Sequence, residues 1–258
     1  MPRFSANLSM MFQEYAFLDR FKAARDAGFA AVEFLFPYDH SPDDLEKAVV
    51  ENALEISVFN LFPGDWQAGE RGLAALPDRD AEFRASVARA LPYAEAVGAR
   101  RLHAMAGLVE PDADRETTYL NNIRYAAERL AKANLELLIE PINPRSMPGY
   151  FLSTTAQAVD LIDRVKHPAL RLQFDIFHHQ ITRGDVMQSL TDCKDVIGHI
   201  QIASVPDRQE PDTGELNYAE IFKYIDQIGY SGWVGCEYVP RNGTREGLGW
   251  LAKTGNAG

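Results

Sequence analysis

The chain has 258 residues, of which 46% are hydrophobic and 24% are charged, and its formal net charge is −11. This composition supports a sizeable core and argues against disorder, and the acidic balance argues against a nucleic-acid partner, which clustered Lys and Arg would have to bind. The two cysteines have no metal-site spacing, and no apolar run reaches signal-peptide or membrane length, so we expect a cytoplasmic protein with a small-molecule ligand and no membrane partner.

Eight short stretches of mostly apolar residues predict β-strands, because each soon ends at turn-forming residues. In chain order they lie at residues 4–9, 31–36, 55–62, 101–106, 135–143, 170–176, 196–203 and 233–238. Apolar runs of this kind are typical of the strands of a parallel sheet, which are buried on both faces.

Longer stretches with apolar residues at helical spacing lie between these strands and predict helices. In chain order they lie at residues 15–27, from 42 onward, 78–97, 115–133, 153–165, 185–193 and 218–228, with one short helix in the tail after 241. Ser41 and Pro42 are typical of an N-cap and a first helical residue. Pro92 lies inside the third helix, where we expect a kink or a break. The polar loop at residues 63–77 is long enough to suggest a functional loop or a lid.

The strict alternation of strands and helices predicts a parallel sheet with right-handed crossovers. Eight such units in 258 residues match the number and length of a (β/α)₈ TIM barrel, an α/β fold. A doubly wound open sheet is the alternative, but no Gly-x-Gly-x-x-Gly follows a strand and no Walker sequence occurs, so we expect no nucleotide cofactor. Because no linker or shift in composition divides the chain, we expect residues 1–258 to form one domain.

Polar residues recur at or near the ends of the last four predicted strands, namely Glu140, Asp175, Gln201 and Glu237. TIM barrels carry their chemistry at the carboxyl ends of the strands, and adjacent strands lie roughly 4.8 Å apart. Four neighbouring strand ends can therefore converge on one ion. A single strand-end carboxylate is more often salt-bridged or solvated, and a single glutamine can fill a barrel layer, but the repetition favours one shared site.

Three carboxylates and one amide would offer only oxygen ligands, which suit Mg²⁺ or Mn²⁺ better than zinc. A divalent cation also explains how three negative charges tolerate burial, since without it the like charges raise one another's pKa. We therefore predict that Glu140, Asp175, Gln201 and Glu237 bind a hard divalent cation, Mg²⁺ or Mn²⁺.

Other polar residues near the predicted open end are candidates for substrate contact. His178 lies three residues beyond Asp175, and Arg208 lies in the loop after the seventh strand, where its fork geometry suits an anion. The alternatives are a surface loop histidine and a surface loop charge. His103 and Glu33, on the fourth and second strands, are interpreted first as hydrogen-bonded polar groups, and His103 is kept as a substrate-binding candidate.

Ten stretches are more specific together than any one motif. They are NLSMMF, AGFAAVEFLFPY, LFPGDW, LHAMAG, NNIRYAAERLA, LIEPIN, MPGYFLST, HIQIA, PDRQEPDTGELNY and GYSGWVGCEY. Over nearly its whole length the chain resembles the hydroxypyruvate isomerase family of xylose-isomerase-like TIM barrels.

The resemblance implies that Glu140 and Glu237 are paired catalytic carboxylates and that Asp175 and Gln201 complete the metal site. It also implies that His178 and Arg208 face the substrate. Ketose 3-epimerases of the same fold carry a histidine where this chain has Gln201, which favours an isomerase.

We accordingly expect an isomerase that interconverts hydroxypyruvate and tartronate semialdehyde (2-hydroxy-3-oxopropanoate) through an enediolate. One carboxyl group would remove a proton beside the carbonyl and the other would return one to the neighbouring carbon, while the metal stabilises the negative oxygen. The alternatives are a 2-oxo-tetronate isomerase, whose relatives share the NLSMMF and GCEY patterns, and a ketose 3-epimerase.

Two further alternatives come from other classes. A DNA-repair endonuclease of the AP type shares this barrel but needs several histidine ligands and a basic face, whereas the chain has six histidines and a charge of −11. A non-catalytic sugar-binding barrel is the last alternative. The expected partner is a small hydroxy-oxo acid, and a homo-oligomer is compatible with the sequence.

Overall fold

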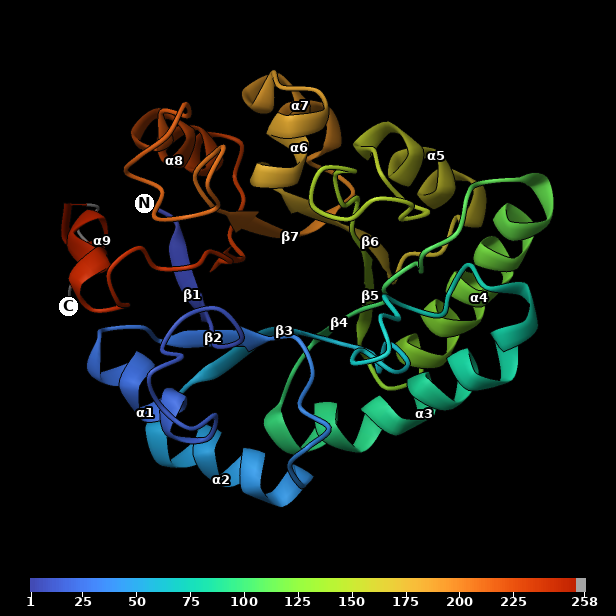
Figure 1. Cartoon of the computed structure of the whole chain (residues 1–258), viewed down its shortest axis with the longest axis horizontal. Helices are drawn as coiled ribbons and strands as arrows, with labels where there is room; N and C mark the ends of the chain where they lie inside the picture. The colour runs from blue at the N-terminus through green and yellow to red at the C-terminus, as the bar shows by residue number, and fades with distance from the viewer. Residues whose placement is uncertain (254–258) are drawn as a thin grey trace.

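Eight parallel strands close into a barrel in sequence order in the computed structural model, which describes residues 1–253 (Figure 1). The strands are β1 (Arg3–Asn7), β2 (Ala31–Phe34), β3 (Glu55–Asn60), β4 (Arg101–His103), β5 (Glu136–Ile139), β6 (Leu170–Asp175), β7 (Ile197–Ile202) and β8 (Trp233–Cys236). The pairing of β1 with β8 closes the ring, which confirms the predicted TIM barrel.

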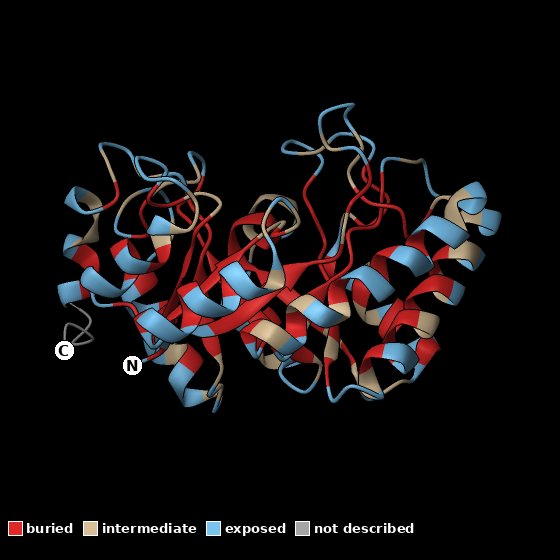
Figure 2. Ribbon diagram, turned by 90° about the horizontal axis from the view of Figure 1, so that it is seen from below, coloured by how far each residue is buried: buried red, intermediate tan, exposed pale blue. Residues whose placement is uncertain are grey.

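Helices surround the barrel and cover the outer side of its strands (Figure 1). They are α1 (Asp19–Asp26), α2 (Pro42–Asn52), α3 (Asp80–Val97), α4 (Ala113–Ala131), α5 (Thr155–Val165), α6 (Ile176–Thr182), α7 (Val186–Cys193), α8 (Tyr218–Gln227) and α9 (Gly249–Lys253), with 3₁₀ turns at Pro77–Arg79 and Glu246–Leu248. Figure 2 shows the strands mostly buried and the helices exposed on their outer faces. The main apolar core therefore lies between strands and helices, as the alternating pattern predicts.

Side-chain caps fix the starts of α2, α4 and α5. The Ser41 hydroxyl accepts a hydrogen bond from the backbone N–H of Asp44 at 3.1 Å, which confirms the predicted N-cap of α2. Thr154, inside the range 153–165 predicted for this helix, caps α5. Asp112 caps α4, which starts before the predicted residue 115 because this carboxylate satisfies the backbone N–H of Arg115.

Three predictions about helices need correction. The first helix begins only at Asp19, because residues 13–18 form turns. The break expected at Pro92 is absent, since α3 runs without interruption past it. Pro92 and Ala88, whose carbonyl loses its partner there, are both on the exposed face, where water can replace the missing hydrogen bond.

The third correction concerns α6, which begins directly at the end of β6 and was not predicted. Its seven residues are too few to show an amphipathic repeat. Asp175 caps this helix, with its Oδ1 accepting a hydrogen bond from the backbone N–H of Phe177 at 2.8 Å. The strand therefore delivers both a carboxylate and a short helix to the open end of the barrel.

The strand register places the predicted site residues side by side. Asp175 on β6 is paired in register with Gln201 on β7, and Gln201 in turn with Gly235 on β8, two residues before Glu237.

None of the helices described within residues 1–253 is both long and apolar enough to cross a membrane.

Candidate metal and active site

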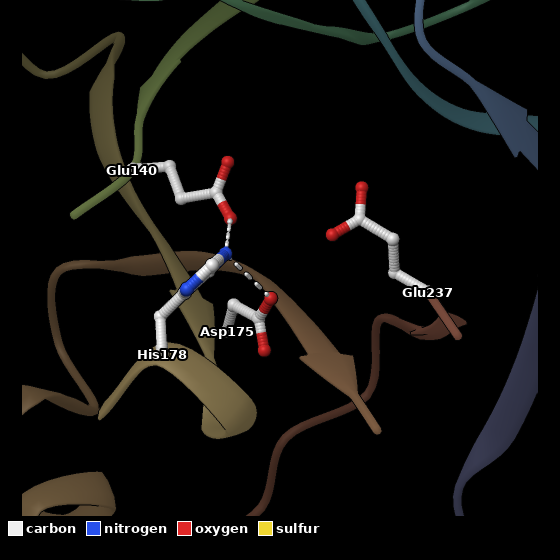
Figure 3. Close-up of side chains that lie close together, drawn as sticks. All are labelled: Glu140, Asp175, His178 and Glu237. Atoms are coloured by element: carbon white, nitrogen blue, oxygen red, sulfur yellow. Dashed lines mark ion pairs between the residues drawn. The ribbon is translucent and has the colours of Figure 1, made fainter. Parts of the chain in front are cut away.

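Four buried side chains converge at the carboxyl ends of β5, β6 and β8. Glu140 follows β5, Asp175 ends β6, His178 lies on α6 and Glu237 follows β8. One ligand atom from each lies within 4.8 Å of those of the other three. Figure 3 shows the four side chains pointing toward a common space, with Glu140 and Glu237 on opposite sides of it. Three of the four residues predicted to bind a metal are therefore together.

The fourth predicted ligand, Gln201, lies next to this group on β7 and is buried. Its Oε1 accepts a hydrogen bond from Nε2 of Gln173 at 2.7 Å, and the same Nε2 donates to Oε2 of Glu140 at 3.1 Å. An amide oxygen has two lone pairs, so Oε1 of Gln201 retains one for a cation. Gln173, which the sequence analysis did not single out, thus bridges two of the predicted ligands.

His178 presents a proton to the site rather than a lone pair. Its Nδ1 accepts from the backbone N–H of Asn143 at 3.3 Å and lies 2.6 Å from the side-chain Nδ2 of Asn143. That amide is oriented by Ser146, whose backbone N–H donates to its Oδ1 at 2.9 Å. In the neutral ring the proton is therefore on Nε2, which lies 3.5 Å from Asp175 and 3.8 Å from Glu140. The alternative of a surface histidine is wrong, since His178 is buried.

Arg208 reaches into the site from the loop after β7. Its Nη2 donates a short hydrogen bond to Oε2 of Glu237 and lies 3.4 Å from Oδ2 of Asp175, and its guanidinium lies over the ring of Phe177. The alternative of a free surface charge is therefore wrong. The buried Nε makes no hydrogen bond to any residue described by the structure, so one donor of the fork remains for a ligand.

Burial and mutual repulsion make the carboxyl groups poor acids. Burial, reinforced by the charges of Glu237 and Asp175, raises the pKa of Glu140 well above its usual range. Burial also raises the pKa of Asp175, and it raises the pKa of Glu237 to about 8, although Arg208 opposes both shifts. The single positive charge of Arg208 does not offset the three carboxylates.

The histidines nearby are neutral. Burial lowers the pKa of His178 well below its usual value, and burial lowers the pKa of His103 to about 3. Nδ1 of His103, on β4, lies 3.7 Å from Oε2 of Glu140. Neither ring nitrogen of His103 makes a hydrogen bond to any residue within 1–253, so the interpretation of His103 as a hydrogen-bonded polar group is wrong. It remains a candidate for substrate binding.

These residues fit a hard divalent cation. The buried Oε1 of Glu140 has no hydrogen-bond partner among the described residues, and it belongs to the group of converging oxygen donors. A charge of +2 among three carboxylates would remove the repulsion that raises their pKa values. Since Nδ1 of His178 is an acceptor, the set of Glu140, Asp175, Gln201 and Glu237 fits better than one that includes His178.

The sequence analysis missed a polar network inside the barrel beneath these residues. Glu33, interpreted as a hydrogen-bonded polar group, is fully buried and bonded to several side chains. The signal for the network lies in alternate strand positions, because Ser5 with Asn7 and His199 with Gln201 are spaced by two residues and share one face of their strands.

The comparisons with known proteins agree over the full length of the chain. It is 54% identical to the 2-oxo-tetronate isomerase of Cupriavidus necator and 47% identical to the hydroxypyruvate isomerase of Escherichia coli, each over 97% of this chain and 98% of the relative. A crystal structure of a protein from Brucella melitensis described as an AP endonuclease of family 2 superposes with a TM-score of 0.97 at 49% identity, over 98% of this chain and 99% of that one.

A sequence model of the xylose isomerase-like TIM barrel matches residues 21–254. That range runs from α1 to the end of the described chain and includes every residue of the candidate site. The closed ring of eight strands and the full-length identities agree with it. The chain belongs to the xylose isomerase-like TIM barrel family.

Proposed function

We propose that the chain is an isomerase that moves a carbonyl between adjacent carbons of a small hydroxy-oxo acid and interconverts hydroxypyruvate and tartronate semialdehyde. The observation that carries this proposal is the pair of buried carboxyl groups of Glu140 and Glu237, on opposite sides of one site (Figure 3). The relatives named hydroxypyruvate isomerase and 2-oxo-tetronate isomerase support an isomerase of this kind.

Glu140 and Glu237 would share the proton transfers. Carbonyl migration needs one group that removes a proton beside the carbonyl and one that returns a proton to the neighbouring carbon. Burial raises the pKa of Glu140 well above its usual range and the pKa of Glu237 to about 8, which favours groups that can hold a proton during the reaction. Their places on two sides of the site give access to two adjacent carbons.

A divalent cation, Mg²⁺ or Mn²⁺, would be held by Glu140, Asp175, Gln201 and Glu237. When bound, it would polarise the substrate's oxygens as a Lewis acid. The donors of the protein would supplement this. Nε2–H of His178 lies 3.5 Å from Asp175 in the site, and the buried Nε–H of Arg208 has no hydrogen-bond partner among the described residues, so both can bind substrate oxygens. The planar guanidinium suits the carboxylate of a 2-oxo acid.

His103 completes the proposed substrate contacts. As a neutral imidazole without a hydrogen-bond partner among the described residues, it can donate to or accept from a substrate hydroxyl. The side chains of Glu140 and Glu237 are buried, and shielding of the reacting carbons from water would protect a reactive enediolate from loss of its proton to solvent.

A second candidate is the isomerisation of a four-carbon 2-oxo-tetronate at the same site. The relative from Cupriavidus necator, named for this reaction, shares more residues with the chain than the hydroxypyruvate isomerase of Escherichia coli does, 54% against 47%. The chemistry at the two reacting carbons is the same, so the two candidates differ only in the room for one more hydroxymethylene group.

The test is an assay of the purified protein against hydroxypyruvate, 2-oxo-tetronates and free ketoses, with chelator and with added Mg²⁺ or Mn²⁺. We expect the highest kcat/KM with hydroxypyruvate and loss of turnover with chelator. A preference for the tetronate would select the second candidate, and a preference for ketoses would reject both. Cleavage of an abasic DNA duplex, or full turnover after chelation, would overturn the proposed metal-dependent isomerase.

A further inference from the structure

The carboxylate of Glu33 is the centre of the polar network inside the barrel. Glu33 lies on β2 and has no exposed surface. Its two oxygens accept hydrogen bonds from buried side chains on three other strands, β1, β3 and β7, those of Ser5 (3.3 Å), Asn7 (3.1 Å), Ser57 (3.1 Å), His199 (2.7 Å) and Gln201 (2.8 Å). Barrel interiors are usually filled by bulky apolar side chains, and a buried carboxylate is costly unless it is fully paired. A network of this kind therefore calls for a functional reason.

Amide groups connect Glu33 to both of the proposed catalytic carboxyl groups. Nδ2 of Asn7 donates to Oε1 of Glu33 at 3.1 Å and to Oε1 of Glu237 at 3.3 Å. On the other side, Gln201 donates to Glu33, accepts from Gln173, and Gln173 donates to Glu140. One buried carboxylate thus reaches each partner of the pair through bridging amides.

The bond from Gln201 to Glu33 also fixes which end of that amide faces the site. A carboxylate can only accept hydrogen bonds, so it holds the NH₂ group of Gln201 at 2.8 Å. Rotating the amide by half a turn would place its carbonyl oxygen against a carboxylate oxygen and would leave Nε2 of Gln173 facing a second donor. The oxygen of Gln201 is therefore directed away from Glu33, toward Gln173.

Gly235 on β8 provides the space that Glu33 occupies. A Cβ atom at residue 235 would lie 2.3 Å from Oε2 and 2.5 Å from Oε1 of Glu33. The backbone of Gly235 does not have a positive φ, so alanine could adopt its conformation, and the three atoms nearest to the added Cβ all belong to the carboxyl group of Glu33. The absence of a side chain at residue 235 therefore leaves room for the carboxylate of Glu33 and does not serve a turn with positive φ.

We propose that Glu33 is a positioning residue that orients the amides of Gln201 and Asn7 toward the cation-binding group of Glu140, Asp175, Gln201 and Glu237. This inference rests on the proposed function, because it assigns Glu33 a task at the proposed cation site. Glu33 touches neither substrate nor cation and acts through the two amides. Outer partners that orient metal ligands typically change metal affinity 10- to 100-fold when removed.

Two variants test this proposal in different ways. Glu33→Gln keeps the volume of the side chain but replaces one acceptor by a donor. Gly235→Ala keeps every polar group and displaces the carboxylate of Glu33 by steric contact. The matched control is Gly198→Ala on β7, another strand glycine, where a Cβ would meet Arg171 and Leu138 at 2.7 Å and not the network.

The first readout is the dissociation constant of Mn²⁺ without substrate, measured by electron paramagnetic resonance of the free ion. We expect Glu33→Gln and Gly235→Ala to weaken Mn²⁺ binding about 10- to 100-fold while Gly198→Ala changes it by less than about threefold. Thermal unfolding of the three variants shows whether a loss of stability alone accounts for the change. An equal loss of affinity in the Gly198→Ala control, or wild-type affinity in both network variants, would overturn the proposal.

A double-mutant cycle then tests the route of action. If Glu33 acts through Gln201, the effect of Glu33→Gln on Mn²⁺ affinity shrinks in a Gln201→Ala background, whereas additive effects contradict that route. Mn²⁺ binding and turnover of the wild-type protein distinguish a failure of the proposed function from a failure of the role proposed for Glu33. Failure of the wild type to bind Mn²⁺ or to isomerise any of the acids rejects the proposed function, while binding and turnover that the network variants leave unchanged reject only the role of Glu33.

Discussion

Asn143 donates its backbone N–H to Nδ1 of His178 at 3.3 Å, and this bond determines what His178 can do. With Nδ1 occupied as an acceptor, the neutral ring carries its proton on Nε2, 3.5 Å from Asp175. A protonated nitrogen cannot bind a cation, so His178 can lie within the group of converging side chains without being a ligand. Glu140 and Asp175 would bind the cation through carboxylate oxygens, to which this limit on a protonated nitrogen does not apply.

The first prediction separates these roles of His178. In His178→Ala, we expect kcat/KM for the isomerase substrate to fall about 10²-fold or more, because a donor to the substrate is lost. The dissociation constant of Mn²⁺ should change less than about threefold, as measured by electron paramagnetic resonance. A collapse of Mn²⁺ affinity would instead make His178 a ligand. The matched control is His167→Ala, since His167 lies in the connection between α5 and β6, at the opposite end of β6 from Asp175.

The second prediction concerns the paired carboxyl groups. Glu140→Gln and Glu237→Gln should each lower kcat by about 10² to 10⁴, since an amide cannot carry a proton between carbons. Because both residues are also proposed ligands, Mn²⁺ binding must be measured alongside turnover. The decisive result is turnover at saturating Mn²⁺ with binding verified: near-wild-type kcat there would remove that residue from the mechanism. Exchange of the substrate's carbon-bound proton in D₂O should be measured in both variants. The variant that loses this exchange identifies the residue that takes the first proton.

The third prediction is that cation affinity rises with pH. Burial raises the pKa values of Glu140 and Asp175 and raises the pKa of Glu237 to about 8 in the metal-free protein. Protons therefore compete with the cation below that pH, and binding must release them. We expect the Mn²⁺ association constant to increase as the pH rises toward about 8, the pKa of Glu237. Calorimetry in buffers of different ionisation enthalpy should show proton release at pH 7, and binding without proton release would contradict the assignment of the ligands.

Removal of the cation should also make the stability of the fold decline as the pH rises. A carboxyl group whose pKa is higher in the folded protein holds more protons there than in the unfolded chain, so raising the pH from about 4.5 toward about 8 destabilises the metal-free fold. Saturating Mn²⁺ should abolish this decline because it stabilises the ionised groups. Thermal unfolding across this range, with and without chelator, measures both effects.

The fourth prediction concerns Pro92 in α3. Pro92→Ala should raise the free energy of unfolding by about 1 to 3 kcal/mol, because alanine restores the hydrogen bond to the carbonyl of Ala88 on an exposed face. Urea denaturation measures the change, and unchanged kcat serves as the control, since α3 supplies none of the candidate site residues. A loss of stability would mean that Pro92 contributes more in packing than it costs in hydrogen bonding.

The sequence by itself determined the barrel and the positions of the strand-end residues. Apolar runs that end at turn residues are local features, and so is the alternation of strands with amphipathic helices. The order of parallel strands around a ring follows from that alternation, which places Glu140, Asp175, Gln201 and Glu237 on four consecutive strands. Because α6 has only seven residues, it shows no periodic pattern of apolar residues, and the sequence did not predict it.

Only the tertiary structure decided how these residues are oriented and what they share. The proton on His178 depends on Asn143, 35 positions earlier, and the orientation of Gln201 depends on Glu33, 168 positions earlier. The raised pKa values of the carboxyl groups likewise come from their joint burial and mutual repulsion. These effects act through distances of a few ångströms between segments far apart in the chain, so no local pattern in the sequence records them.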